Sequence, residues 1–151
     1  MMQNDQQISL REAAETDSDA VYSLKKAAFS RYVKMHYGKW DEAEQREYHI
    51  ARFVSNDIKI ITVYRRVVGF VSIVTEADCI KVNQLVIHPK HQGQGIGKRC
   101  MTLIKQEARR MELPVRLQVM KVNPRARKFY QCVGFVVAGE TDTHFQMELK
   151  P

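Results

Sequence analysis

Hydrophobic and polar residues alternate along the first third of the chain in a way that predicts one strand followed by two helices. Residues 8–12 have the short alternating pattern of a strand. After them, Asp17 or Ser18 can cap a helix whose apolar positions share one face, and this helix should run into the low thirties. Asp41 can cap a second helix, which we expect to continue to Val54.

The middle of the chain changes to β-branched and aromatic residues, which favour strands. Residues 58–74 predict a hairpin of two strands, interrupted by Arg65 and Arg66. A further strand is expected over residues 80–87. It should end near His88, because Pro89 cannot donate a ladder hydrogen bond and keeps the preceding residue out of helical geometry.

The last third of the chain predicts two helices among three strands. From Ile96 to Met111, apolar residues recur at helical spacing, which indicates an amphipathic helix. Asn123 can cap a second helix, and Gly134 should stop it. The strands are expected at Val115–Met120, Phe135–Ala138 and His144–Leu149. We therefore predict an α+β fold in a single domain over residues 1–151.

The net charge of the chain favours anionic partners but does not identify which anion is bound. The 151 residues include 24 Lys and Arg against 17 Asp and Glu, a net charge of +7 that favours contact with anions. Nucleic acid, a phosphate-rich cofactor and a merely solvated basic surface all fit this balance. The basic residues are spread along the chain, and no helix-turn-helix or zinc motif is present, so we expect no nucleic-acid partner.

The same sequence indicates a cytoplasmic protein with no membrane association and no metal. It has no apolar run of about eighteen residues, and residues 1–7 are polar, unlike a signal peptide. Cys79, Cys100 and Cys132 are odd in number and lack the paired spacing of a zinc site or a disulfide framework. We expect reduced thiols, mostly buried at core positions of strands and helices.

A glycine-rich turn between a strand and a long helix is the first candidate site. It consists of Gln92-Gly93-Gln94-Gly95-Ile96-Gly97, with Lys98 and Arg99 directly after it. The helix N-terminus offers unpaired N–H groups to an anion, and glycines let a phosphate come close to them. A Walker A loop would need Gly at position 92 and Ser or Thr at position 99, and the dinucleotide fingerprint has another glycine spacing. An ordinary strand-to-helix turn remains the alternative.

A second motif, taken together with the glycine turn, points to a particular protein family. The motifs are Val86-Ile87-His88-Pro89 with Gln92-x-x-Gly95-x-Gly97, and Asn123-x-x-Ala126-x-x-Phe129-Tyr130 followed by Gly134-Phe135. Together they resemble the acetyl-CoA-binding motifs of the GNAT superfamily of N-acetyltransferases. The resemblance is close over residues 82–136 and follows the order of elements elsewhere.

This resemblance implies both a fold and a cofactor site. The fold would be three-layered, with a mixed, mostly antiparallel, bent sheet of six to seven strands, about four helices, and splayed fourth and fifth strands. Acetyl-CoA would lie in the gap between those strands. The backbone of Leu85, Val86 and Ile87 would pair with its pantetheine. The turn from Gln92 to Lys98 would hold the pyrophosphate, and the other wall would comprise Asn123, Ala126, Phe129 and Tyr130.

The implied reaction is direct attack of a primary amine of a small molecule or peptide on the thioester, through a tetrahedral intermediate. By the resemblance, Tyr130 is the general acid for the departing thiolate. Many family members place a glutamate on the fourth strand, whereas this chain has Asn83-Gln84, so we expect Gln84 to orient a water that accepts the proton. Other candidate bases are Glu76, Asp41, Glu42 and His144.

The segment from His36 to Glu42 lies where this superfamily builds its acceptor pocket. We predict that acceptor-binding residues come from this segment and the last strand: Tyr37, Trp40, Asp41, Glu42 and His144. An aromatic cluster that only anchors the junction of the two helices fits equally well. A CoA-binding sensor without catalysis and a basic nucleic-acid-binding module are the competing functions. The sequence does not decide between a monomer and a homodimer.

Overall fold

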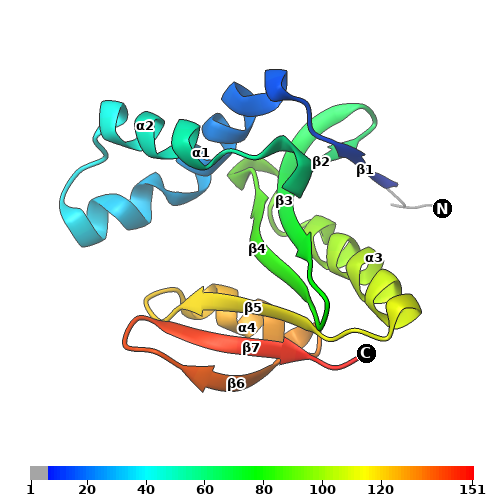
Figure 1. The fold of residues 1–151 in the computed structure, drawn as a ribbon. Helices are drawn as coiled ribbons and strands as arrows, with labels where there is room; N and C mark the ends of the chain where they lie inside the picture. Colours follow the sequence, from blue (N-terminus) through cyan, green and yellow to red (C-terminus); the bar gives the residue numbers. More distant parts are fainter. Residues whose placement is uncertain (1–6) are drawn as a thin grey trace. The chain divides into compact units, whose positions relative to one another are not determined.

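The computed structural model of the chain describes residues 7–151; the polar stretch 1–6 lies outside this part (Figure 1). Within it, seven strands form a mixed sheet in the order β1-β2-β3-β4-β5-β7-β6, and four α-helices connect them. The chain divides into two compact units. The first comprises the described residues up to Ser72 and Gln84–Gly97, and the second comprises Ile73–Asn83 and Lys98–Pro151.

The first unit carries an antiparallel set of strands and two helices. Its elements are β1 (Ile8–Glu12), α1 (Ser18–Tyr37), α2 (Glu42–Arg52), β2 (Ile58–Val63), most of β3 (Arg66–Thr75) and the end of β4 (Ile80–Ile87). The register between β2 and β3 shifts between Ile61 and Thr62, which marks a β-bulge. Buried side chains from α1, β2, β3 and β4 form the core: Val21, Leu24, Ile58, Ile60, Phe70 and Val86.

Helix α1 is longer than the sequence pattern predicted. It continues to Tyr37 and ends at Gly38, whose φ of 85° is the left-handed conformation that glycine adopts at little cost. Asp17 makes no side-chain cap. Its carboxylate instead accepts hydrogen bonds from Arg11, at 2.9 and 3.0 Å, and from the N–H of Ala14, at 2.8 Å.

Helix α2 begins as predicted and ends earlier. The Asp41 carboxylate accepts a hydrogen bond from the N–H of Glu44 at 3.1 Å, which confirms the cap. The helix stops at Arg52, so Val54 lies beyond it. Phe53 has an extended backbone at the C-terminal boundary and ends the helical hydrogen-bond pattern.

The second unit joins three strands and two helices to the start of β4. Its elements are α3 (Ile96–Met111, whose first two residues belong to the first unit), β5 (Val115–Met120), α4 (Pro124–Cys132), β6 (Val136–Glu140) and β7 (His144–Leu149). Strand β7 lies between β5 and β6 and is antiparallel to both, with α4 close to β5 (Figure 1). Val115, Leu117 and Val119 are buried on one face of β5, while alternate residues point outward.

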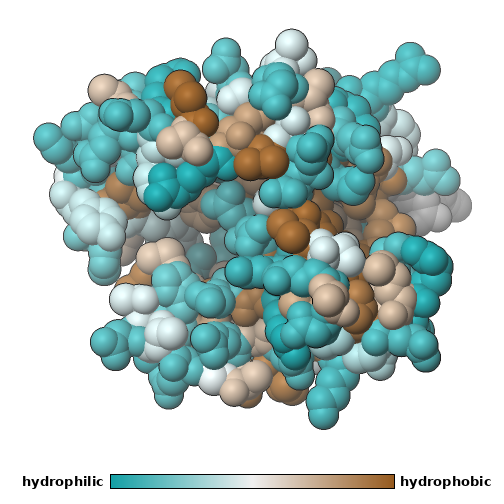
Figure 2. Space-filling model, in the orientation of Figure 1, coloured by the Kyte–Doolittle hydropathy of each residue, from teal (hydrophilic) through white to brown (hydrophobic). Residues whose placement is uncertain are grey.

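The parallel pairing of β4 with β5 is short. It covers Ile80 with Val115 and Lys81 with Arg116, and no further residue pair within the described chain. This agrees with the expected splaying of the fourth and fifth strands, and the α+β class is confirmed. On the face drawn in Figure 2, hydrophilic residues dominate, and hydrophobic ones form small groups.

Two of the three thiols are buried, and the third is not. Cys79 and Cys100 are 4% and 0% exposed, whereas Cys132, the last residue of α4, is exposed. The expectation that Cys132 occupies a core position was therefore wrong. Burial raises the pKa of Cys100 to about 12, so this thiol stays protonated and unreactive.

Candidate functional site

The glycine turn before α3 adopts the conformation that an anion cradle needs. Gly93 and Gly95 have φ angles of 77° and 80°, in the left-handed region that side-chain-bearing residues rarely occupy. A Cβ added at either position would meet no atom within 4 Å. The glycines are therefore needed for backbone conformation, and the space beside them is open to a ligand.

Hydrogen bonds fix this turn to the end of β4. The Gln92 side-chain amide donates to the carbonyl of Ile87 at 3.0 Å, and His88 Nδ1 accepts from the N–H of Lys90 at 3.1 Å. The N–H of His88 donates to the carbonyl of Val68 on β3 at 2.8 Å. The turn is thus held in place before any ligand arrives, which reduces the entropic cost of binding.

The charges at the start of α3 differ from those of α1 and α2, although α4 also has no acidic residue in its first turn. Asp19 lies in the first turn of α1, and Glu42 and Glu44 lie in that of α2, where carboxylates stabilise the helix dipole. The first turn of α3 has no acidic residue and carries Lys98 instead. This arrangement is unfavourable for an isolated helix, and it suits a helix whose N-terminus receives an anion.

The end of β4 lies unusually close to β3. An added Cβ at Gly69 would be 2.2 Å from the carbonyl oxygen of Val86. The Val86 side chain is 2% exposed and belongs to the core of the first unit, while Leu85 and Ile87 on either side are half-buried. The backbone of β4 at Val86 is therefore packed directly against β3 at Gly69.

The start of α4 is organised by a cap. Asn123 Oδ1 accepts a hydrogen bond from the N–H of Ala126 at 3.1 Å, as the sequence predicted, and Pro124 occupies the first turn. This cap gives Asn123 and Ala126 a structural role that is independent of any cofactor contact.

Tyr130, also on α4, is 8% exposed and packs edge-on against its neighbours. Its ring centroid lies 5.0 Å from that of Phe129 and 5.5 Å from that of Phe135. Burial, and secondarily the nearby Cys100, raise the pKa of Tyr130 well above its ordinary value. The phenol is therefore neutral at physiological pH and available as a hydrogen-bond donor. Phe129 is half-buried.

The junction of α1 and α2 engages three of the residues that we expected at the acceptor pocket. Trp40 Nε1 donates to Tyr22 Oη at 3.2 Å and to Glu42 Oε2 at 3.1 Å. Glu42 also pairs with Lys26 at 2.7 Å and with Arg46 at 3.0 Å, and the Lys26 hydrogen bond foremost lowers its pKa to about 2.

This geometry favours the helix-anchoring interpretation for Trp40, Asp41 and Glu42, because their polar groups already have partners within the junction. Tyr37 differs from them. It is 75% exposed at the end of α1, with its ring against His36 at 5.0 Å between centroids. Tyr37 lies in the helix, not in the loop where we expected it.

The candidate bases are distributed between the units. Gln84 is half-buried on the part of β4 that belongs to the first unit. His144 begins β7 in the second unit, with Nδ1 at 2.8 Å from Thr143 Oγ1. Glu76 follows the end of β3, and its N–H donates to the carbonyl of Cys79 at 2.8 Å.

A buried polar cluster that the sequence did not reveal links α1 to α2. His49 is 3% exposed, and its Nδ1 lies 3.1 Å from Lys25 Nζ. A lysine ammonium has no acceptor, so Nδ1 must accept, and Nε2 carries the proton that is donated to the carbonyl of Ser18 at 2.9 Å. A lone histidine in a helical pattern gives no sequence signal for such a cluster.

This cluster predicts a loss of stability in mild acid. Burial and the Lys25 charge lower the pKa of His49 in the folded state below its ordinary value near 6.5. As the pH falls below about 6.5, His49 of the unfolded chain takes up a proton before His49 of the folded chain does. The free energy of unfolding should then decrease by up to about 1.4 kcal/mol per pH unit.

Urea unfolding between pH 7.5 and 5 checks this expectation. The slope should be smaller in His49→Gln, which keeps a donor for Ser18 and cannot titrate. His36→Gln, at an exposed position of α1, should keep the slope of the wild type. Equal slopes in the wild type and His49→Gln would contradict the assignment.

The chain that carries these motifs matches the model of a known protein family. The model of the acetyltransferase (GNAT) family matches residues 19–135, which run through both units. The chain belongs to this family. It is thus an acetyltransferase, and the GNAT resemblance predicted from residues 82–136 is confirmed.

Solved structures share the GNAT fold at low sequence identity. The PaiA N-acetyltransferase from Thermoplasma acidophilum in complex with coenzyme A is 18% identical, with a TM-score of 0.77 over 95% of this chain and 99% of that one. An acetyltransferase from Thermus thermophilus is 16% identical, with a TM-score of 0.76 over 95% and 97%. The Escherichia coli ribosomal-protein-S18-alanine N-acetyltransferase is 18% identical, with a TM-score of 0.70 over 95% and 93%. No match was found among the curated proteins.

The residues of the turn fit the cofactor of the GNAT family, acetyl-CoA. Gly93 and Gly95 leave room where side chains would stand, and the first turn of α3 lacks a carboxylate that would repel a pyrophosphate.

Across residues 7–151, no helix is long and apolar enough to cross a membrane. The same residues hold no group of three or more potential metal ligands.

Proposed function

We propose that this acetyltransferase transfers the acetyl group of acetyl-CoA to a primary amine of a small molecule or peptide. One observation carries the proposal. The turn at Gly93 and Gly95 opens a helix whose first turn has Lys98 and no carboxylate, which favours a bound pyrophosphate. The turn would hold the pyrophosphate, and the pantetheine would lie along the backbone of Leu85–Ile87, beyond the end of the β4–β5 ladder.

The proposed step is direct acyl transfer with no covalent enzyme intermediate. The lone pair of the neutral amine attacks the thioester carbonyl carbon through a tetrahedral intermediate. The C–N bond forms first and gives this intermediate, in which the nitrogen then loses a proton. As the carbonyl re-forms, the C–S bond breaks, and the sulfur leaves as a thiolate that takes up a proton. The products are the N-acetylated amine and free coenzyme A. Backbone N–H groups of β4 would stabilise the developing oxyanion.

Tyr130 would act on the leaving sulfur as a hydrogen-bond donor. Its pKa is raised by burial, so complete transfer of its proton to a thiolate of ordinary pKa near 8.5 is strongly uphill. A hydrogen bond needs no such transfer and still stabilises the charge that develops on sulfur. The proton that the thiolate finally takes up can come from solvent.

Gln84 would orient a water that removes the amine proton. A lysine-like amine with a pKa near 10.4 requires about 4.6 kcal/mol to become neutral at pH 7. Gln84 itself cannot accept a proton, and its half-buried side chain on β4 can hold a water by an amide hydrogen bond. Asn83 beside it is exposed and also lacks a carboxylate.

Replacing Tyr130 by Phe is expected to lower kcat about tenfold and to leave the KM for acetyl-CoA within twofold. Loss of one hydrogen bond to a developing charge corresponds to about 1.4 kcal/mol. Release of free thiol across a panel of amines measures both parameters. Tyr64→Phe removes an exposed hydroxyl in the turn between β2 and β3 and should behave like the wild type.

Unchanged kcat in Tyr130→Phe would remove this residue from the mechanism. Tight acetyl-CoA binding by the wild-type chain, with no thiol release from any amine, would contradict transfer itself. That result would favour a CoA-binding sensor, for which the missing carboxylate at Asn83-Gln84 is the supporting feature.

A further inference from the structure

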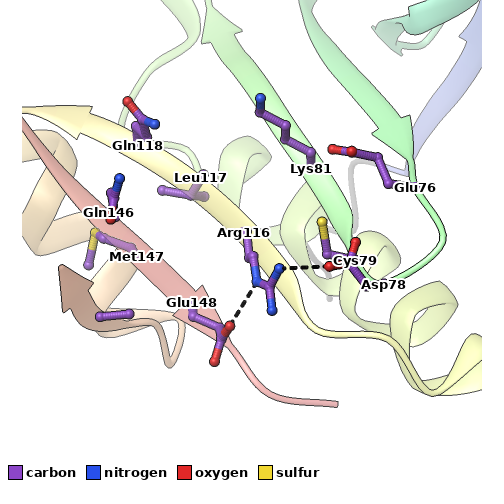
Figure 3. A pocket seen from close by; sticks show the side chains of 11 residues that line it. Glu76, Asp78, Cys79, Lys81, Arg116, Leu117, Gln118, Gln146, Met147 and Glu148 are labelled. Carbon is purple, nitrogen blue, oxygen red and sulfur yellow. Dashed lines mark hydrogen bonds and ion pairs between the residues drawn. The ribbon is translucent and has the colours of Figure 1, made fainter. Parts of the chain in front are cut away.

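The second unit contains a hollow that none of the assigned roles uses. It has a volume of about 400 Å³ and lies over the outward residues of β5 and β7, between β6 and the turn that joins β3 to β4 (Figure 3). All of its lining residues belong to the second unit. The volume falls within the range of small-molecule sites.

Small residues on β6 create this hollow. Ala138 lines one side, and Gly139 follows it. A Cβ at Gly139 would lie 2.7 Å from Gln146 Oε1, so the glycine lets the Gln146 amide lie across β6. Across the β5–β7 ladder, Gln146 is the register partner of Gln118, so two amide side chains stand next to each other on the outward face.

An ion-pair network frames the hollow at the other end. Arg116 Nε donates to Glu148 Oε2 at 2.9 Å, and Arg116 Nη1 donates to Asp78 Oδ2 at 3.4 Å (Figure 3). These contacts join the turn between β3 and β4 to β5 and β7. Arg116, Glu148 and Asp78 neutralise one another, so they form the wall of the hollow, and a ligand would bind to other side chains.

Four polar side chains of the lining remain without a partner of their own. Within residues 7–151, no side-chain hydrogen bond or ion pair is found for Glu76, Lys81, Gln118 or Gln146. They supply one carboxylate, one ammonium and two amides. A ligand that complements this set carries an ammonium for Glu76, a carboxylate for Lys81 and further hydrogen-bonding groups for the amides. A simple anion or a simple diamine would satisfy only half of it.

The hollow also lies beside the end of the parallel ladder. Lys81 and Arg116 form the last residue pair between β4 and β5, and Gln118 lies two residues further along β5. Under the proposed function, the pantetheine runs beyond this point. Lys81, which lines the hollow, and Leu85, where we place the pantetheine, lie on the same strand β4, so the strand itself connects the hollow with the proposed donor site.

We infer that this hollow binds the acceptor, and that the acceptor is a zwitterionic amine, a free amino acid or a short peptide with a free carboxylate. The inference rests on the proposed function and specifies its substrate class. Lys81 would bind the carboxylate, Glu76 would bind the ammonium form of the amine until its proton is removed, and Gln118 and Gln146 would bind the neighbouring polar groups. The ion pairs of Arg116 would hold these residues in place.

Binding can be tested without turnover through the side-chain NH₂ signals of glutamine. The twenty amino acids and glycylglycine are added to the ¹⁵N-labelled chain in the presence of coenzyme A. We expect a saturable shift of the Gln118 and Gln146 signals with at least one of them, and a shift at least tenfold weaker with the corresponding C-terminal amide. Gln106, exposed on α3, serves as the unshifted reference. No shift with any compound of the panel would overturn the inference.

Transfer kinetics provide the second arm. Lys81→Gln should raise the KM for the free amino acid at least tenfold and leave the KM for its C-terminal amide and for acetyl-CoA within twofold. Lys150→Gln, with the same charge change at an exposed position, should alter none of them. If amines are acetylated but Lys81→Gln does not change the preference for the carboxylate, the hollow is not the acceptor site, and the proposed function stands. If acetyl-CoA neither binds nor turns over, the proposed function fails first.

Discussion

Replacing Gly95 by Asp is expected to weaken acetyl-CoA binding about 100-fold, which corresponds to about 2.7 kcal/mol. The residue lies in the turn before α3, where an added Cβ meets no atom of the chain within 4 Å. That open space is where we place the pyrophosphate. An aspartate there would bring a negative charge and a side chain between the phosphates and the N–H groups of the helix.

Gly38→Asp is a matched control for this measurement. Gly38 has a φ of 85°, close to the 80° of Gly95, and an added Cβ there also meets no atom within 4 Å. Both variants therefore carry the same backbone strain, and they differ in their distance along the chain from the turn. Calorimetric titration with acetyl-CoA should show normal affinity for Gly38→Asp. Equal affinities of a folded Gly95→Asp and the wild type would remove the pyrophosphate from this turn.

Gly69→Ala should lower the free energy of unfolding by about 3 kcal/mol. The new methyl group would stand 2.2 Å from the carbonyl oxygen of Val86, a distance that no real Cβ contact reaches. Backbone atoms must then shift, because the carbonyl cannot rotate away like a flexible side chain. For a chain of this length, the melting temperature should fall by roughly 6–12 °C.

Gly139→Ala provides the contrast for this effect. Its added Cβ would lie 2.7 Å from Gln146 Oε1, which is the far end of a flexible side chain and can move. Thermal melts of the two variants should therefore differ clearly, with Gly139→Ala close to the wild type. A melting temperature of Gly69→Ala within 2 °C of the wild type would show that β3 and β4 can separate locally at small cost.

The repetitive elements could be predicted because their periodicity reports burial directly. Strand β5 has the alternating pattern of Val115, Leu117 and Val119, and its bounds were predicted to the residue, as were those of α3. The end of α1 could not be placed in this way. Its last residues are polar or exposed, and it is the left-handed Gly38 that fixes where the helix stops.

The candidate site could be predicted only in part, for a physical reason. The glycines of the turn carry their own conformational signal, so their positive φ angles follow from the sequence. Glu42 carries no such signal. Its pair with Arg46 has the i,i+4 spacing of a single helix, but its shorter contact, with Lys26, comes from the other helix, and only the packing of α1 on α2 shows it. His49 is a similar case, because its contacts with Ser18 and Lys25 span long sequence separations.

The exposure of Cys132 decides how the reaction should be followed. A thiol-specific dye that detects released coenzyme A will also label this side chain, because Cys132 is accessible while Cys79 and Cys100 are buried. Each chain should therefore add one equivalent of dye signal that does not come from coenzyme A released by turnover. A Cys132→Ser background removes this signal. In the unmodified chain, protection of Cys132 by acetyl-CoA would report ligand binding two residues from Tyr130 without any radioactive label.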